Sequence, residues 1–328
     1  MSGAVGPAPA LRVTWLGHST VVLDLRAADG RTARLVTDPL LGRHAGLLRR
    51  RGERPDEEAW RHADAALVSH LHHDHAELRS LRLLGDVPVL AARANARWLR
   101  DKGLRGVGLD GAWHEPAGHG TAGHGTAGPG GGQGAGHGAG AGRWHEGDWY
   151  DVAGVQVRLT PAVHGHRPMP HRPNAAAGHL VRAAPGGSGG PGGGPTVWAV
   201  GDTERSTALS RVRDLAGGRV DVALVPVSGW GPRLSGGHLG PVQAAELCAE
   251  VGARVAIPVH WGTLHAPGGR HLPPGWMDHA GAAFAAALRR TAPEARAVVL
   301  RPGGTWEEEW SGEWSGEWSG EGSGENDS

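Results

Sequence analysis

The sequence predicts an α/β protein built as a sandwich of two β-sheets covered by helices. The first part of the chain carries closely spaced strand patterns, as in a β-meander, and the second part alternates short apolar strands with helix patterns. Several strands are apolar throughout and lead directly into helices, which is typical of sheets with helices packed on them. With 328 residues, the chain is long enough to bury a sizeable core.

Three strands are expected at the start of the chain. Residues 11–15, 19–26 and 32–38 have strand patterns, and the sequence Ala-Asp-Gly at 28–30 suits a hairpin turn between the last two. These three segments therefore predict an antiparallel beginning to one sheet.

The middle of the chain changes from strand to helix spacing and back. Residues 64–69 form a short apolar strand, and helical spacing follows in residues 76–84 and 89–102. Residues 149–159 resemble a hairpin that closes through Ala153-Gly154, with alternating apolar and polar side chains in its second arm.

The last part of the chain alternates strands and helices. The expected elements are strand 196–200, helix 203–215, strand 220–227, helix 241–251, strand 254–259, helix 277–290 and strand 297–301. Pro241 suits the first position of its helix.

Three segments lack the side chains needed for a packed core. Residues 116–142 and 184–195 contain no large apolar residue, and residues 306–328 repeat the sequence Trp-Ser-Gly-Glu. We expect one domain over residues 1–305, with disordered inserts at 116–142 and 184–195, and a disordered acidic tail at 306–328.

Charge and composition exclude several classes of protein. No apolar run approaches the roughly 20 residues that a membrane span requires, no secretory signal is visible, and a single cysteine cannot form an internal disulfide, so a cytoplasmic protein is expected. The tail carries eight acidic residues and no Lys or Arg, which leaves residues 1–305 with a net charge of +8. That charge favours an anionic small-molecule substrate. No basic stripe interleaved with aromatic residues accompanies it, so no nucleic-acid partner is expected.

The strongest motif is the sequence HLHHDH at residues 70–75, directly after an apolar strand. In an extended chain His70 and His72 point the same way and can share one metal ion. Asp74 and His75 fall where the chain turns into the next helix and can face a second ion. Imidazole and carboxylate groups are ligands that zinc and similar divalent metals prefer.

This motif resembles the H-x-H-x-D-H signature of the metallo-β-lactamase superfamily, and more narrowly the branch that contains L-ascorbate-6-phosphate lactonase and N-acyl-phosphatidylethanolamine phospholipase D. The resemblance extends from Arg12 to about His265, apart from the Gly-rich inserts. Its further motifs are TWLGHST at 14–20, VTDP at 36–39, TPAVH at 160–164, GDT at 201–203 and PVHWGT at 258–263.

The resemblance implies a four-layer αββα sandwich, with two mixed β-sheets flanked by helices, and a site for two divalent metal ions. Zinc is the first choice, with manganese and iron as alternatives. Seven ligands are implied, three for the first ion, three for the second and one between them: His70, His72 and His164; Asp74, His75 and His260; and Asp202.

The function implied is a dinuclear metal-dependent hydrolase, in which a bridging hydroxide attacks a small ester, lactone or phosphodiester. Asp74, Asp202 and His238 are the expected catalytic residues. His238 lies in a His-x-x-Pro-x-x-Ala segment of the kind that contacts substrate in the family, although a solvent-facing histidine beside glycines fits the same sequence.

Three other residues have two readings each. Asp38 suits an acceptor that orients a ligand histidine, or a turn-forming Asp before proline. His18 suits a side chain facing the metal cleft, or one that fixes the turn at Gly17. Arg233 suits an anion-binding residue or an ordinary surface arginine.

Two alternatives to this hydrolase remain. A non-enzymatic metal-binding protein could use a histidine-rich tract: His114, His119, His124, His137 and His145. A nuclease of the same superfamily is the second alternative, but the chain leaves no room for the additional domain that such nucleases carry.

Overall fold

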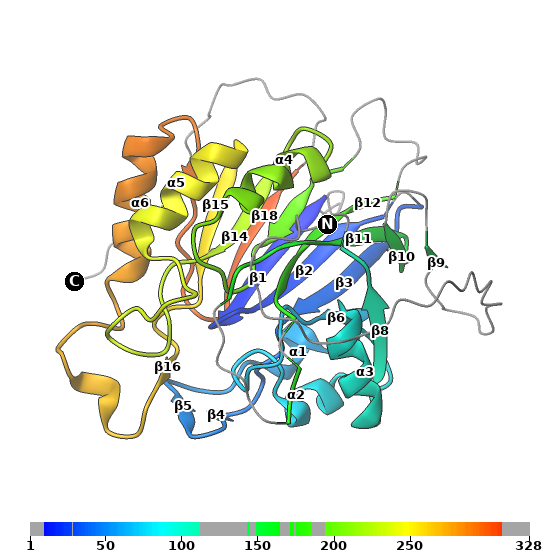
Figure 1. Cartoon of the computed structure of the whole chain (residues 1–328), viewed down its shortest axis with the longest axis horizontal. Coiled ribbons are helices and arrows are strands. Elements are labelled where there is room, and N and C mark those ends of the chain that lie inside the picture. Colours follow the sequence, from blue (N-terminus) through cyan, green and yellow to red (C-terminus); the bar gives the residue numbers. More distant parts are fainter. Residues whose placement is uncertain are drawn as a thin grey trace, which may run out of the picture.

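The computed structural model describes residues 10–27, 29–111, 143–144, 149–164, 171–173, 175–184 and 194–309. These residues form two large mixed sheets with helices on the outer faces (Figure 1). The predicted α/β sandwich of two sheets flanked by helices is confirmed. The expected insert at 116–142, most of the one at 184–195, the histidine-rich tract and most of the tail lie outside the described residues.

The first sheet begins antiparallel and continues parallel. Its strands, in spatial order, are β18 (Gly304–Glu308), β1 (Leu11–Gly17), β2 (Thr20–Arg26), β3 (Thr32–Thr37), β6 (Ala65–Leu67), β7 (Pro88–Ala92) and β8 (Arg105–Leu109). The expected hairpin joins β2 to β3, with Val21 opposite Thr37. From β3 to β8 the neighbours run parallel.

The second sheet is also mixed. Its strands, in spatial order, are β17 (Arg296–Ala297), β15 (Val255–Val259), β14 (Val222–Pro226), β13 (Val197–Ala199), β12 (Ala177–Ala183), β11 (Val155–Pro161), β10 (Tyr150–Val152) and β9 (Arg143–Trp144). The predicted hairpin at Ala153-Gly154 joins β10 to β11, and both turn residues have positive φ, at 51° and 81°. A small third sheet contains β16 (Leu264–His265), β5 (Leu48–Arg50) and β4 (His44–Ala45).

Helices cover the outer face of each large sheet. The helices are α1 (Glu57–Trp60), α2 (Leu78–Leu83), α3 (Arg93–Asp101), α4 (Val212–Leu215), α5 (Pro241–Val251) and α6 (Ala280–Thr291), with 3₁₀ turns η1 (Thr207–Arg211) and η2 (Gly269–His271). Helix α5 has the predicted bounds; Gly252, in the left-handed region at φ 67°, ends it. None of the helices in the described ranges is long and apolar enough to cross a bilayer.

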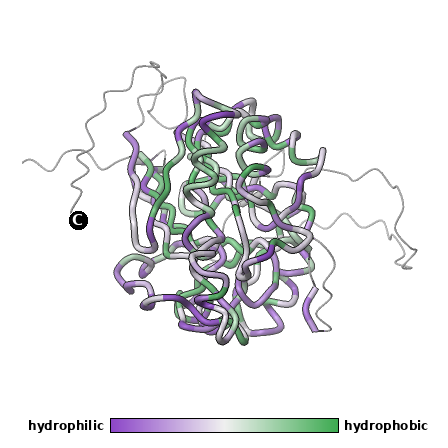
Figure 2. The backbone as a smooth tube through the Cα atoms, turned by 90° about the vertical axis from the view of Figure 1, so that its left-hand side faces the viewer, coloured by the Kyte–Doolittle hydropathy of each residue, from purple (hydrophilic) through white to green (hydrophobic). Residues whose placement is uncertain are grey.

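The main core lies between the two sheets. Trp15, Leu23 and Leu35 of the first sheet pack with Val157 and Leu224 of the second, and all five side chains are buried. A separate apolar cluster fills the space between the second sheet and helices α5 and α6. Figure 2 shows the same distribution, with hydrophobic residues along the central strands and hydrophilic residues in the peripheral loops.

Several predicted elements differ from the structure. Residues 89–102 were expected to form one helix, but strand β7 precedes α3, because the apolar run at 88–92 is short and pairs with β6 and β8. The expected helix 203–215 is a 3₁₀ turn followed by one turn of α-helix, and the expected strand 297–301 pairs only at Arg296–Ala297.

The beginning of the expected tail also differs. Residues 306–308 belong to β18, which pairs antiparallel with β1. Trp306 is buried while Thr305 and Glu307 on either side are exposed, so the side chains alternate as in a strand with one buried face. Residues 310–328 lie outside the described ranges.

Candidate metal centre

A cluster of histidine and aspartate side chains lies where strands of both sheets end. His70, His72, Asp74 and His75 follow β6, and the other predicted ligands follow strands of the second sheet: His164 after β11, Asp202 after β13 and His260 after β15. Strands β11, β13 and β15 run in the same direction, so their carboxyl ends meet at one edge. Side chains far apart in the sequence therefore converge at this edge.

The first group contains His70, His72 and His164. One ligand atom from each lies within 4.8 Å of the others, and the Nδ1 atom of His72 is 3.0 Å from the Nε2 atom of His164. The structure thus brings together the three residues expected to hold the first ion. Their role as ligands remains a prediction.

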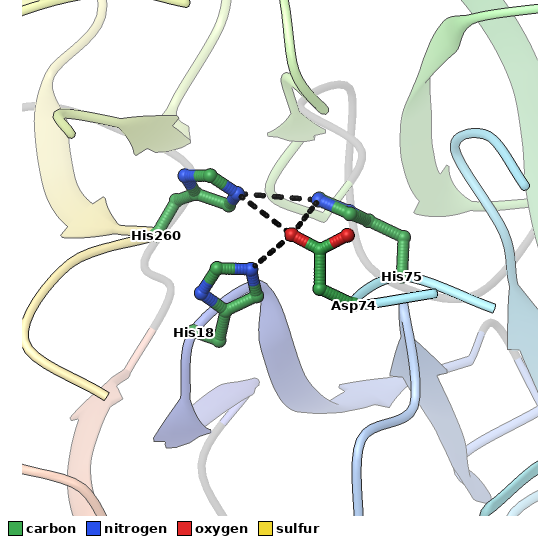
Figure 3. Close-up of side chains that lie close together, drawn as sticks. All are labelled: His18, Asp74, His75 and His260. Carbon is green, nitrogen blue, oxygen red and sulfur yellow. Dashed lines mark hydrogen bonds and ion pairs between the residues drawn. The ribbon is translucent and has the colours of Figure 1, made fainter. Parts of the chain in front are cut away.

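The second group contains Asp74, His75 and His260, as expected, together with His18 (Figure 3). The Asp74 Oδ2 atom lies 3.0 Å from His18 Nε2, 3.7 Å from His75 Nε2 and 3.9 Å from His260 Nε2. His18 comes from the turn between β1 and β2, so both sheets contribute to this group. Its side chain faces the cluster, which decides between its two readings.

Asp202 lies between the groups. Its Oδ2 atom is 3.2 Å from the Nε2 atoms of both His75 and His260, and a ligand atom of His70 lies within 4.8 Å of His75 and Asp202. This is the position that the resemblance implies for a bridging carboxylate.

The hydrogen bonds of the histidines direct their lone pairs into the cluster. Four rings donate from Nδ1 to acceptors outside it: His70 to Ser69 Oγ at 3.0 Å, His75 to Asp38 Oδ2 at 2.8 Å, His164 to the Gly237 carbonyl at 2.8 Å and His260 to the Ser228 carbonyl at 2.9 Å. In each neutral ring the Nε2 atom is therefore an acceptor.

These inward acceptors have too few donors. The Nε2 atoms of His75 and His260 lie 3.2 Å apart beside the Asp202 carboxylate. Within the cluster, three buried atoms find no hydrogen-bond partner in the described part of the chain: His70 Nε2, His72 Nε2 and Asp202 Oδ1. Buried acceptors left unpaired are costly. A divalent cation would satisfy them, so the residues fit the metal ions that the sequence implies.

The electrostatics of the cluster match this requirement. Burial lowers the pKa of His70 well below its usual value and the pKa of His72 to about 4, so both imidazoles stay neutral. Burial disfavours the charge on Asp202, but His260 and His75 outweigh it and hold its pKa well below the usual range. Neutral imidazoles and ionised carboxylates are the forms that bind metal.

His75 differs from His70 and His72 in the direction of its pKa shift. Burial again favours its neutral form, but the carboxylates of Asp202, Asp38 and Asp74 surround it and raise its pKa well above the usual value. The field at the centre of the cluster therefore stabilises positive charge, whether a proton or a metal ion supplies it.

Asp38 acts as the acceptor that one of its two readings predicts. Its Oδ2 atom accepts from His75 Nδ1 and, at 2.7 Å, from Ser69 Oγ, while Oδ1 accepts from the Ser69 N–H at 2.8 Å. Ser69 in turn accepts from His70. A single carboxylate thus orients one histidine from each predicted metal group. The part played by Ser69 was not predicted, since the residue belongs to no motif of its own.

Backbone strain concentrates at the cluster. Five non-glycine residues of the described chain have positive φ, and His18, Asp38 and His260 are among them, at 52°, 36° and 63°. Such conformations persist where the surroundings enforce them. The His18 carbonyl accepts from the His260 N–H at 2.8 Å and from Trp15 Nε1 at 2.8 Å, so the backbone of His18 also fixes its turn.

His238 lies against the bridging position. Its Nε2 atom is 3.3 Å from Asp202 Oδ2, and its Nδ1 atom faces the carbonyls of Ser235 and Gly236, both at 3.2 Å. Burial opposes its protonation, but contact with Asp202 raises its pKa. The side chain is 13% exposed, which does not fit a histidine directed only at solvent. Arg233 is exposed and lines no part of the cluster.

Glu204 supports the loop that carries His238, a role that the sequence did not predict. Its Oε2 atom accepts from the Gly237 N–H at 3.1 Å, and the carbonyl of the same glycine holds His164. The only sequence signal is the position of Glu204, two residues after Asp202.

The sequence of the chain is similar to those of known metal-dependent hydrolases. The family model of the beta-lactamase superfamily domain matches residues 33–261. A metal-dependent hydrolase of Methanoculleus marisnigri is 26% identical over 260 residues, which cover 78% of this chain and 83% of the relative. A metal-dependent hydrolase of Methanopyrus kandleri is 25% identical over 297 residues, covering 90% of this chain and 100% of the relative.

Solved structures show the same fold. A metallo hydrolase from the archaeon Ignicoccus hospitalis superimposes with a TM-score of 0.59 at 18% identity, over 92% of this chain and 99% of that one. At this identity the likeness supports the two-sheet architecture and no more.

Proposed function

Because the chain belongs to the metallo-β-lactamase superfamily, we propose that it is a metal-dependent hydrolase that uses two divalent cations to cleave a small ester, lactone or phosphodiester. The observation that carries the proposal is the convergence of unpaired acceptors around Asp202. The hydrolytic class rests on the family and its relatives, which are themselves named metal-dependent hydrolases. The dinuclear site and the substrate class are the part proposed here.

The proposed ligands divide as the sequence predicts. His70, His72 and His164 would hold one cation, Asp74, His75 and His260 the other, and Asp202 would contact both. When bound, such cations lower the pKa of a water molecule and stabilise negative charge that develops on a substrate oxygen. Zinc is the first choice for this set of imidazole and carboxylate ligands.

The protein's own side chains would orient these groups and move a proton. His18 donates to Asp74, and Asp38 accepts from His75, so each fixes the direction of a proposed ligand. His238 is partly exposed beside Asp202 and holds its Nε2 atom toward the cluster. We assign it contact with the substrate and donation of a proton to the leaving oxygen.

The charge of the chain bears on the choice of substrate. With +8 on residues 1–305, an anionic substrate would be attracted to the body at low ionic strength. We place the protein in the cytoplasm, as expected from its single cysteine.

The Asp202→Ala variant tests the dinuclear site. We expect it to fold, to retain less than the two metal ions per chain of the parent protein, and to lose hydrolysis of an activated phosphodiester or lactone by a factor of about 10³ or more. Metal analysis, circular dichroism and a panel of lactones, phosphodiesters and acyl esters provide the measurements. Asp214→Ala, on the exposed side of α4, is the matched control. Full activity of Asp202→Ala would exclude the proposed mechanism.

The His238→Ala variant separates substrate contact from metal binding. We expect both ions to stay bound, because the ring lies beside Asp202 but is not one of the proposed ligands. We expect kcat to fall by about 10²-fold, because general acid catalysis is typically worth that much. A poor leaving group should show a larger loss than an activated one. If His238→Ala instead lost metal and the protein that kept its metal had an unchanged kcat, His238 would be a metal ligand.

A further inference from the structure

A strongly cationic groove lies on the outside of the loop that carries the metal-binding motif. It has a volume of about 790 Å³ and is lined by five arginines, two histidines and one carboxylate: Arg43, Arg54, Arg79, Arg82, Arg172, His44, His73 and Glu77. None of the seven proposed metal ligands lines it. Its lining residues come in part from α2 and β4, which lie at the same end of the molecule (Figure 1). It is therefore separate from the metal centre, although His73 belongs to the same loop.

The positive charge of the groove is largely unbalanced. Arg43 pairs with Glu53, but the structure shows no ion pair from Arg54, Arg79, Arg82 or Arg172 to any described residue. The one acidic residue in the lining is Glu77. Its carboxylate accepts from the Ser80 N–H at 2.7 Å and the Ser80 hydroxyl at 2.8 Å, and its negative charge offsets only part of the positive charge, at Arg172. Several guanidinium groups thus share one concave surface with a single carboxylate among them.

One of these guanidinium groups is fixed in place. Arg172 is half-buried; its Nη1 atom donates to the Leu71 carbonyl at 2.9 Å and to the Ala76 carbonyl at 3.3 Å, and its guanidinium lies 4.7 Å from the centre of the Trp98 ring. An arginine that is held by its neighbours loses little side-chain entropy when it binds a ligand. The same contacts join both ends of the metal-binding loop to the wall of the groove.

We propose that this groove is a binding site for a small polyanion, of the class of molecules that carry two or more phosphate groups. Guanidinium groups bind phosphate oxygens in a bidentate manner. More than one phosphate group is needed to balance the charge of four arginines that have no ion-pair partner among the described residues. The volume matches that of sites for metabolite-sized ligands. The ligand contacts Arg79 and Arg82 from α2, Arg54 from the facing segment and Arg172 at the base.

Binding is tested with a fluorescent polyanion that does not chelate metals, 8-methoxypyrene-1,3,6-trisulfonate, added to the metal-loaded full-length protein. Fluorescence anisotropy at low salt should show one saturable site, and fructose 1,6-bisphosphate should displace the probe. The Arg79→Gln/Arg82→Gln variant should bind the probe about tenfold more weakly, because two charge-assisted contacts are lost. Arg54→Gln, changed outside any helix, should weaken binding in the same direction.

The control is Arg289→Gln/Arg290→Gln, which removes the same charge from exposed positions at the end of α6. It should leave the affinity within about twofold. Equal losses in the two double variants would show that only net charge attracts the probe, and unchanged binding in Arg79→Gln/Arg82→Gln would show that the probe binds outside the groove. Either result, or the lack of saturable binding, would overturn the proposal.

Discussion

At the scale of single residues, the arrangement around Asp38 shows how the cluster is held. Its carboxylate contacts His75 directly and His70 through Ser69, so one residue outside the ligand set orients both halves of the site. Its φ of 36° is in a region where asparagine is tolerated better than most residues, and alanine would be strained. A test of its charge should therefore use asparagine.

We expect Asp38→Asn to lower metal affinity by about tenfold to a hundredfold without unfolding the protein. The amide oxygen can still accept from the Ser69 N–H, but the NH2 group then takes the place of Oδ2 and cannot accept from His75, so that ring loses its orienting acceptor and becomes a poorer ligand. Competition with a chromogenic chelator measures the affinity. Asp64→Asn, at an exposed carboxylate that accepts only from the Arg34 backbone, provides the control. Equal affinities in the two variants would contradict the role assigned to Asp38.

The residues of the site were predictable where a motif carried them. All seven expected ligands lie in one cluster because each sits in a short segment with a distinctive pattern, such as Pro258 to Thr263 around His260. Ser69, Ser228 and Glu204 were not predictable, because each acts through a backbone group or a neighbouring ring that only the folded chain brings near.

At the scale of elements, β12 connects the two halves of the second sheet and buries a histidine between the sheets. His179 is fully buried, its ring bonds the backbone of Leu90 in β7, and burial lowers its pKa to about 4. Since the unfolded chain has the ordinary pKa of 6.5, it takes up a proton below that pH while the native protein does not.

Acid should therefore destabilise the fold through His179 as the pH falls from about 6.5 to about 4, and the loss should level off below that pH. For the metal-free protein we expect this residue to contribute about 3 kcal/mol of that loss. Urea unfolding across this range should show a weaker pH dependence for His179→Gln than for the parent protein. The other buried histidines titrate in both proteins, so the difference isolates this one. The same pH dependence of the free energy of unfolding in both proteins would contradict this contribution of His179.

Elements with clear periodicity were predicted well, and so were the short apolar strands β6, β13, β14 and β15, but β7 and β12 were not. Helix α5 has the expected bounds because its apolar residues repeat along one face and Pro241 and Gly252 mark its ends. Strand β7 was taken for the start of a helix, since a short apolar run carries no period of its own. Strand β12 was not predicted, because Gly178 and the Gly-rich sequence after it weaken the strand pattern.

At the scale of the whole molecule, the border between body and tail lies later than composition suggests. Trp306 belongs by sequence to the Trp-Ser-Gly-Glu repeats, yet it is 7% exposed and packs in the main core. Its place in the core comes with the pairing of β18 and β1, and such a long-range contact is not visible in a local repeat.

Two truncations should consequently differ. Removal of residues 310–328 should leave the free energy of unfolding unchanged, whereas removal of residues 306–328 should lower it by about 3 kcal/mol or more, because a buried tryptophan and a strand are lost. Urea unfolding followed by circular dichroism measures both. Equal stability of the two shortened chains would show that β18 contributes nothing to the fold.

The pairing of β18 with β1 also brings the two ends of the described body together. Leu11 lies directly opposite Glu308 at the edge of the first sheet, although almost the whole chain separates them (Figure 1). A short peptide could join these ends, and the chain could then be opened elsewhere, for instance in the exposed Gly217-Gly218 turn between α4 and β14. The fold is thus compatible with circular permutation. In the permuted chain β18 would be followed directly by β1, so the two paired strands would be neighbours in the sequence.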